Sequence, residues 1–541
     1  MRSYFSNSRE VLRKILFTYF LVITALTLMP FDPVKKKLLF YTLFLSVLIF
    51  IIFPYFFQKR KVYKIDKFIS LNYLDTSLLN SREWFFLKVK YILYLLKNGI
   101  PDFYQDVKSF ALNHSLLVLG YLYFGAKMLA YQLLFITVPK TQTFIHGGTY
   151  ANEKEFFSGL LIADILGIAW DSVHYLAIAK YGYVAVSKTD GGVWAFSPLF
   201  PFIISKVTDF LNYIDGSSFG FIFNIIGIRI ASGNYYALSA VLVANFFSFV
   251  SMFVFYKVAC TYLVKENSTP IEIRNGKLKA TLATAFFCFF PTNFAYMTVG
   301  YTESLFFTNC LIAWYFFTKG LKKTQHGEGN YELFIASLFA GLTYLSRYPG
   351  GALFAIFGFT CLFYLIKNLL KENWQISKLY FWDGVKVSSF FIIPVIWQIY
   401  LSNNGADLTQ IQKAYWGVEL IFPIGGWNFW FNHLPTGIPD ITPLVEFWSF
   451  VMLIFILSIA SIRYSWHLTF YSLTFIALYT SATGIAAYSV VRFVGSIWPA
   501  YLQFSEMKSK KNFFIILGLL VYFYFVGVYW LSRWSLRLFW G

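Results

Sequence analysis

The sequence predicts an all-α membrane protein with many membrane-spanning helices. Hydrophobic residues make up 58% of the 541 residues and charged residues only 13%, and the mean hydropathy is +0.58. A soluble domain needs roughly a quarter of its residues charged to cover its surface. Apolar runs of about 20 residues, the length of a helix that crosses the hydrocarbon, recur along the chain. The alternating segments of a membrane β-barrel are absent from the sequence.

Breakers between the apolar runs predict about eleven to thirteen transmembrane helices. The first run follows Arg9, Arg13 and Lys14 and lacks a small-residue cleavage site, so we expect a retained signal-anchor helix. The predicted spans are 15–30, 37–57, 115–138, 237–264, 281–299, 302–318, 332–347, 350–366, 384–401, 443–462, 466–487, 489–504 and 513–532. The short ones around 332–366 and 466–504 leave broken or tilted helices as an alternative.

These spans predict three regions. Residues 1–114 form a membrane hairpin followed by an amphipathic segment on the cytoplasmic face. Residues 115–505 form the main transmembrane domain, and 506–541 carry a final transmembrane helix. The four cysteines lie inside apolar runs without metal-ligand spacing, so we expect core residues rather than disulfides or ligands.

The basic residues predict the orientation. If the N-terminus is cytoplasmic, most Lys and Arg residues lie in cytoplasmic loops, as the positive-inside rule requires. The cluster Lys35, Lys36 and Lys37 is the exception. The net charge of +19 then reflects topology signals facing anionic lipid, which argues against nucleic-acid binding. Two long segments, 139–236 and 402–442, face outward and are rich in aromatic residues, so we expect amphipathic helices lying against the membrane there.

Asp171 is the first candidate for chemistry. It lies in a stretch that we expect to be a helix ended by Gly182, and on this helix it shares a face with His174 and Tyr175. A carboxylate near the membrane interface between Trp and Tyr is poorly solvated, which suits a general base. The alternative is that Asp171 only caps a helix or pairs with another residue within the same loop.

Three further ionisable residues, Glu303, Arg347 and Arg492, interrupt apolar segments on the same outer side. Such residues are expensive in a membrane and have a polar partner or a polar ligand. Arginine suits a phosphate, because its planar fork donates two parallel hydrogen bonds. For Glu303, ligand contact and internal pairing with arginine remain equal alternatives. For the two arginines, we favour phosphate contact over internal pairing.

Common catalytic motifs are missing. The sequence contains no Walker A motif, no dinucleotide fingerprint, no H-E-x-x-H and no nucleophile elbow. The large outer segment also lacks a D-x-D pair, which disfavours a metal-dependent enzyme that uses a nucleotide sugar. A substrate activated by its own lipid-linked phosphate fits this pattern better.

Four stretches, in order, resemble the PIG-V family (GPI mannosyltransferase II) and its prokaryotic relatives. Residues 170–183 are similar to its W-D-[SA]-x-x-[YF]-x-x-I-A-x-x-G-Y signature. The others are Phe196-Ser197-Pro198-Leu199-Phe200-Pro201, the pair Phe290-Pro291-Thr292 and Tyr301-Thr302-Glu303-Ser304, and Gln412-Lys413-Ala414-Tyr415-Trp416-Gly417, which has one residue more than the family pattern. The resemblance covers about residues 160–505.

The resemblance implies a GT-C glycosyltransferase, with Asp171 as its catalytic base. Such an enzyme moves a sugar, mannose in the eukaryotic family, from a polyprenyl or dolichyl phosphate to a lipid or glycan acceptor, and inverts the configuration at C1. No cofactor or metal site is expected. The implied substrate-binding residues are Trp170, Ser172, His174, Tyr175, Glu303, Arg347 and Arg492. The implied location is a prokaryotic plasma membrane, or the ER membrane in a eukaryote.

A transporter or lipid flippase is the alternative from another class. It requires polar residues near the middle of the spans and related halves of the chain. The polar residues of this sequence gather instead at one membrane face, and we find no internal repeat. A non-catalytic scaffold of the same fold is disfavoured by the intact Asp171.

Overall fold

The computed structural model describes the chain in several stretches, and every regular element within them is a helix. Almost all of these residues belong to one compact unit formed by residues 116–213 and 230–541. The predicted all-α class is therefore confirmed for the described part of the chain. The described residues are 114–137, 156, 161–168, 171–188, 191–217, 234–264, 268–328, 330–416, 419, 451–481, 490–507 and 513–535.

Five helical segments in the described stretches are long and apolar enough to cross a membrane. They support the predicted membrane protein, whereas the number of eleven to thirteen spans stays a prediction. The spans expected at 15–30 and 37–57, with the Lys35–Lys37 cluster, lie outside the described residues. The five segments belong to α5 (Ser115–Thr137), α11 (Tyr236–Leu263), η4 (Tyr348–Gly351) with α16 (Ala352–Leu369), α17 (Trp374–Ser388) through α18 (Ile392–Asn403), and α25 (Phe513–Ser535).

The predicted span 281–299 is divided between two helices, and the first of them begins earlier than expected. α12 covers Pro270–Phe289, because Thr269 and Glu272 form a capping box and Pro270 occupies the first helical position. A second proline then starts the short α13 (Pro291–Tyr296). The next two helices, α14 (Glu303–Gln325) and α15 (Glu332–Ser346), begin at or next to the predicted positions 302 and 332.

The predicted span 489–504 is not one α-helix. It consists of α24 (Val490–Val494) and the 3-10 helix η7 (Trp498–Met507). Pro499 lacks an N–H group and cannot continue an α-helical hydrogen-bond ladder. The span predicted at 384–401 lies within the longer α17–α18 segment, and the one at 466–487 begins with α22 (Trp466–Thr480).

Aromatic side chains fill the core of the bundle. Trp314 on α14 is fully buried, and its ring lies 5.1 Å from that of Tyr471, 5.6 Å from Trp498 and 6.0 Å from Phe357. Its Nε1 donates a hydrogen bond to the Tyr262 hydroxyl at 2.9 Å. Aromatic pairs in such geometry stabilise a core beyond the area they bury. Cys288, Cys310 and Cys361 are free and buried, as predicted, and Cys260 is partly buried.

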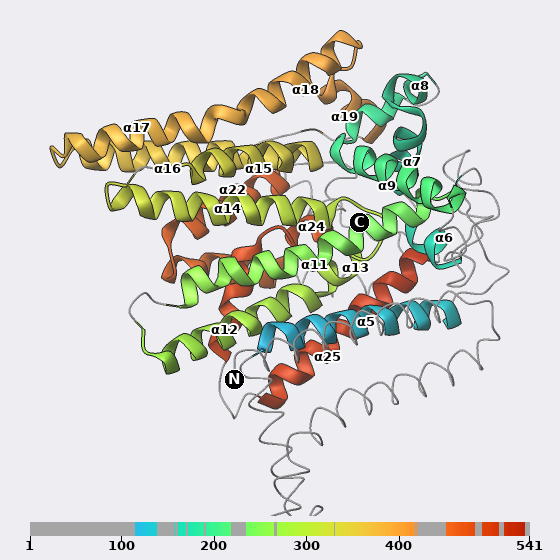
Figure 1. Cartoon of the computed structure of the whole chain (residues 1–541), viewed down its shortest axis with the longest axis horizontal. Coiled ribbons are helices and arrows are strands. Elements are labelled where there is room, and N and C mark those ends of the chain that lie inside the picture. The colour runs from blue at the N-terminus through green and yellow to red at the C-terminus, as the bar shows by residue number, and fades with distance from the viewer. Residues whose placement is uncertain are drawn as a thin grey trace, which may run out of the picture. The chain divides into compact units, whose positions relative to one another are not determined.

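The first large segment between spans carries short helices, as predicted. Figure 1 shows α7, α8 and α9 gathered at one end of the rods formed by α11, α14 and α15. The second outer segment contributes α19 (Leu408–Trp416), which packs on η3, while residues 420–442 lie outside the described residues. The helices of the first segment are α6 (Leu161–Gly167), α7 (Ser172–Tyr181), α8 (Tyr183–Ser187), η3 (Gly191–Ala195) and α9 (Leu199–Gly216).

Candidate active site

Asp171 stands at the start of α7, as the sequence predicts. It occupies the N-cap position, but its side chain makes no capping hydrogen bond. The helix ends at Gly182, whose φ of 76° favours glycine and whose N–H bonds the Ile178 carbonyl at 2.8 Å. Its ψ of 162° lies outside the left-handed helical region that we expected. The carboxylate of Asp171 is therefore directed to a partner other than its own helix.

That partner is Arg492, and the contact belongs to a cluster of four charged residues, which we call the ionic cluster. Arg492 Nη1 donates to Asp171 Oδ2 at 2.8 Å. Arg492 Nε lies 2.6 Å from Glu303 Oε1, as an ion pair without hydrogen-bond alignment. Arg347 Nη1 donates to the same Glu303 oxygen at 2.5 Å. The structure thus brings Asp171, Glu303, Arg347 and Arg492 together, although they are spread over more than 300 residues of sequence.

Helix ends create a favourable field for this cluster. Asp171 and Glu303 lie at the N-termini of α7 and α14, where the helix dipole stabilises negative charge. Arg347 is the C-cap of α15, where the dipole stabilises positive charge. Its backbone is extended, and Pro349 follows two residues later. The helix α15 therefore ends at the residue whose guanidinium joins the ionic cluster.

The members of the cluster differ in exposure. The Glu303 side chain is 1% exposed and that of Arg492 7%, whereas Arg347 is 14% and Asp171 23% exposed. Asp171 is therefore the member that a substrate reaches most easily. Glu303 is the most deeply buried member of the cluster. Its Oε2 has no hydrogen-bond partner among the described residues. An unpartnered buried carboxylate oxygen is costly, and a hydroxyl donor from a ligand would satisfy it.

Aromatic rings hold the two guanidinium groups. The Arg492 guanidinium carbon lies 4.6 Å from the Tyr301 ring centroid, and that of Arg347 lies 4.4 Å from the Phe493 centroid. The backbone N–H of Asp171 also donates to the Tyr301 hydroxyl at 3.1 Å. Tyr301 therefore touches both partners of the Asp171–Arg492 pair. These contacts fix the planes of the arginines and add cation–π attraction.

Burial and charge set the protonation of the site. Burial raises the pKa of Tyr175 to about 12. Burial and the charge of Asp171 raise the pKa of Tyr301 well above its usual range. Both phenols stay neutral at physiological pH, so neither acts as the base.

The remaining predicted residues surround Asp171. Ser172, His174 and Tyr175 are buried on α7. The His174 ring stacks on Phe196 at 4.6 Å, and the Tyr175 ring packs edge-on against Phe196 and Phe200. Their contact with a substrate stays a prediction. Trp170 lies outside the described residues.

Three aromatic residues of this region were not assigned to the site from sequence. Tyr301 and Phe493 are neighbours of predicted residues, and their adjacency to Glu303 and Arg492 was the available signal. Tyr348 had no signal beyond following Arg347. Its hydroxyl donates to the Trp194 carbonyl at 3.0 Å and accepts from Trp397 Nε1 at 3.2 Å, which ties η4 to η3 and α18.

In the described stretches, no three His, Cys, Asp or Glu side chains gather closely enough to hold a metal ion. Comparison with protein-family models, with curated proteins and with solved structures finds no match for this chain. The resemblance to the PIG-V family therefore depends on the four motifs alone.

Proposed function

We propose that this chain is an inverting glycosyltransferase that uses a polyprenyl- or dolichyl-phosphate sugar, with mannose as the expected sugar. The observation that carries the proposal is the ionic cluster: a partly exposed carboxylate, Asp171, paired with one of two arginines that a buried glutamate holds together, at one end of apolar helices. A lipid-linked sugar phosphate needs a base for the acceptor, cations for the phosphate and an apolar surface for its lipid.

In the proposed reaction, Asp171 accepts the proton of an acceptor hydroxyl. The hydroxyl oxygen forms a bond to C1 of the sugar while the bond from C1 to the phosphate oxygen breaks on the opposite face. One displacement inverts the configuration, and the lipid leaves as a phosphate monoester. The ion pair with Arg492 keeps the Asp171 carboxylate oriented before the reaction, which is the task of a positioned base.

The arginines would stabilise the charge that develops on the leaving phosphate. A guanidinium has five N–H donors. The ion pairs within the cluster use Nη1 of Arg347, and Nη1 and Nε of Arg492, so both groups keep donors for phosphate oxygens. Glu303 would hold both arginines through Oε1 and offer Oε2 to a sugar hydroxyl.

A transporter or flippase remains the alternative from another class, and one observation favours it. Lys127 lies near the middle of α5, a candidate span, and its side chain is fully buried. Transporters place charges at such depths. Glycosyl transfer does not need two separated compartments, so an assay in detergent distinguishes the two classes.

The test is sugar transfer by the purified full-length chain in detergent. Labelled dolichyl- or polyprenyl-phosphate mannose is the donor, and a membrane lipid extract supplies acceptors. We expect transfer by the wild type and a loss of about 10²- to 10⁴-fold in Asp171→Asn, the usual contribution of a general base.

Asp209→Asn is the matched control, because Asp209 is an exposed acid on α9 of the same predicted outer segment and pairs with the exposed Lys206. It should keep wild-type activity. Full activity of Asp171→Asn would remove Asp171 from the mechanism. Absence of transfer by the wild type from either donor would overturn the proposed function and favour the transport alternative.

A further inference from the structure

Lys127 forms a second polar centre away from the ionic cluster. Its side chain is completely buried in α5. The Nζ donates to Asn245 Oδ1, to Ser248 Oγ and to the Met297 carbonyl, each at 2.9 Å. Within the described residues no carboxylate pairs with it. An ionisable side chain in a membrane span is expensive, and such a residue usually has a function.

The surroundings of Lys127 match its amino group closely. The three oxygens correspond to the three N–H donors of an ammonium group. The Nζ also lies 4.9 Å from the Tyr123 ring centroid and 5.9 Å from that of Phe249, within reach of cation–π attraction. All these partners are neutral protein groups, which leaves Lys127 no donor for a transported ligand. The centre therefore acts on the protein itself.

Met297 is the first residue of the segment 297–302, which connects α13 to α14. This connection is not α-helical, and all of its residues are buried. Irregular backbone at membrane depth persists only where the protein satisfies its polar groups. Lys127 satisfies Met297, Asn245 Nδ2 donates to the Thr298 carbonyl at 3.0 Å, and Gly300 N donates to the Leu166 carbonyl at 2.8 Å.

Lys127 also orients Asn245. The Oδ1 of Asn245 accepts from Lys127 and from the Tyr131 hydroxyl, which directs its Nδ2 toward the carbonyls of Val241 and Thr298. Loss of the amine therefore weakens the anchors of two consecutive carbonyls in the segment, at Met297 directly and at Thr298 through Asn245.

The backbone of the segment 297–302 packs tightly against neighbouring helices at Gly300. A Cβ built on Gly300 would lie 3.1 Å from the Ala240 Cβ and 3.2 Å from the Gly167 Cα. The backbone of the segment is thus in close contact with α6 and α11. The next residues are Tyr301, which contacts Asp171 and Arg492, and Glu303, which holds both arginines.

We propose that Lys127 is a positioning residue of the ionic cluster: its amino group fixes the segment 297–302, so that Tyr301 and Glu303 meet Asp171 and the arginines. The effect on activity rests on the proposed function, whereas the placement of the segment does not. The two are therefore measured separately.

The first measurement follows the segment by thiol labelling of the full-length chain in detergent. Thr302→Cys is a mild probe, because Thr302 is fully buried and its Oγ1 has no partner among the described residues. It is placed in a Cys260→Ser background, since Cys260 is the partly buried native thiol. We expect slow reaction with N-ethylmaleimide in the presence of Lys127. In Lys127→Ala the reaction should be at least about tenfold faster, and ethylammonium should restore the slow rate by filling the site.

Ser472→Cys is the matched control, because Ser472 on α22 is equally buried and its Oγ also lacks a described partner. It should stay protected in Lys127→Ala. Continued protection of Thr302→Cys in Lys127→Ala would overturn the inference. So would exposure of both probes, since Lys127 would then support the whole fold. If Lys127→Ala does not accumulate, the near-isosteric Lys127→Met replaces it, with the same two outcomes.

The second measurement is sugar transfer. In Lys127→Met we expect kcat to fall by about 100-fold, the cost of a small misplacement of reacting groups, while KM for the donor stays within about twofold. A rise in KM alone would contradict the positioning role. If the wild type transfers no sugar, the proposed function fails, and the thiol labelling still decides whether Lys127 holds the segment.

Discussion

A single oxygen of Glu303 joins the two halves of the ionic cluster. Its Oε1 contacts both Arg347 and Arg492. Of these two arginines, Arg492 is the one that also pairs with Asp171. The two carboxylates and two guanidinium groups balance in charge. Because Glu303 is almost fully buried, removal of its charge would leave two buried cations facing one carboxylate. Such an uncompensated buried charge is far more costly than the loss of a surface pair.

Because two cations would be left facing one carboxylate, we predict that Glu303→Gln destabilises the protein by about 3–5 kcal/mol. This is the usual cost, about 3–5 kcal/mol, of breaking a buried ion pair from one side. Thermal unfolding of the detergent-solubilised chain measures the change as a lower Tm. Glu506→Gln is the control, since Glu506 is 44% exposed and pairs with a half-exposed Lys279. Adding Arg347→Met to Glu303→Gln should recover part of the loss. Equal Tm values for the two single variants would contradict the prediction.

Residue chemistry explains which site residues were predictable. Asp171, Glu303, Arg347 and Arg492 stand out because charges are rare in apolar segments. Pairing of Glu303 with an arginine was one of two equal alternatives, whereas the pair of Asp171 with Arg492 was not predicted, since it joins residues 321 positions apart. Lys127 was missed altogether. Its partners lie 118, 121 and 170 residues away, so no local pattern marks them, and one lysine in an apolar run does not by itself indicate a site.

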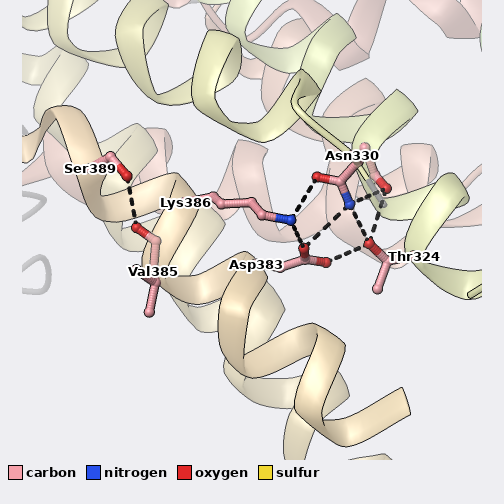
Figure 2. A network of polar contacts seen from close by, with 7 residues as sticks. Thr324, Asn330, Asp383, Val385, Lys386 and Ser389 are labelled. Atoms are coloured by element: carbon pink, nitrogen blue, oxygen red, sulfur yellow. Dashed lines mark hydrogen bonds and ion pairs between the residues drawn. The ribbon is translucent and has the colours of Figure 1, made fainter. Parts of the chain in front are cut away.

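At the level of elements, α14 connects two polar centres. Glu303 starts the helix at the ionic cluster, and the other end carries Lys319 and Lys323, which lie 3.3 Å and 2.6 Å from Glu332. The 23 residues of α14 separate these ends by about 34 Å at 1.5 Å per residue. A polar network beside this far end ties α14 to α17 and to Asn330 in the turn between α14 and α15, as Figure 2 shows.

In that network Asp383 accepts hydrogen bonds from Thr324 Oγ1 at 2.6 Å and from Asn330 Nδ2 at 3.3 Å, and Lys386 Nζ lies 3.4 Å away. Asp383→Asn replaces one acceptor by a donor and leaves the buried Thr324 and Asn330 groups poorly satisfied. We expect a loss of about 1–3 kcal/mol in stability, read as a lower Tm. Sugar transfer per folded molecule should not change, because the ionic cluster lies at the opposite end of α14.

Glu328→Gln serves as the comparison for Asp383→Asn, because Glu328 is exposed in the same α14–α15 turn. It should leave Tm unchanged. A fall in transfer by Asp383→Asn at temperatures where it is fully folded would show that the two ends of α14 are coupled, against this prediction.

The elements themselves were predictable where one apolar run forms one helix, as in α5, α11 and α15. Prediction from apolar length alone was incomplete where local chemistry overrides the apolar run, although broken helices around 466–504 were one of the alternatives. The capping box of Thr269 and Glu272 starts α12 well before its apolar half. Pro499 turns the span 489–504 into a short α-helix followed by a 3-10 helix. Hydropathy reports how apolar a segment is, and therefore whether it can span a membrane. It carries no information on caps or on the missing N–H group of proline.

For the whole molecule, the two ends of α14 indicate which side of the protein faces the cytoplasm. The described Lys319, Lys322 and Lys323 occupy the end opposite Asp171 and Glu303. The positive-inside rule predicts that the lysine end faces the cytoplasm and that the ionic cluster faces outward. A donor presented at the outer leaflet would then meet Asp171 from the correct side.

Two variants, each with one added cysteine in the Cys260→Ser background that keeps the three buried native thiols, test this orientation. Lys188→Cys is exposed after α8, near Asp171 in sequence, and His326→Cys is exposed at the end of α14. In intact cells, a membrane-impermeant maleimide should label Lys188→Cys at once and His326→Cys only after the membrane is permeabilised. The reverse pattern would place the ionic cluster on the cytoplasmic face. The proposed reaction on the outer face would then fail even if Asp171 proved essential, because its sugar donor would have to be presented from the inner leaflet.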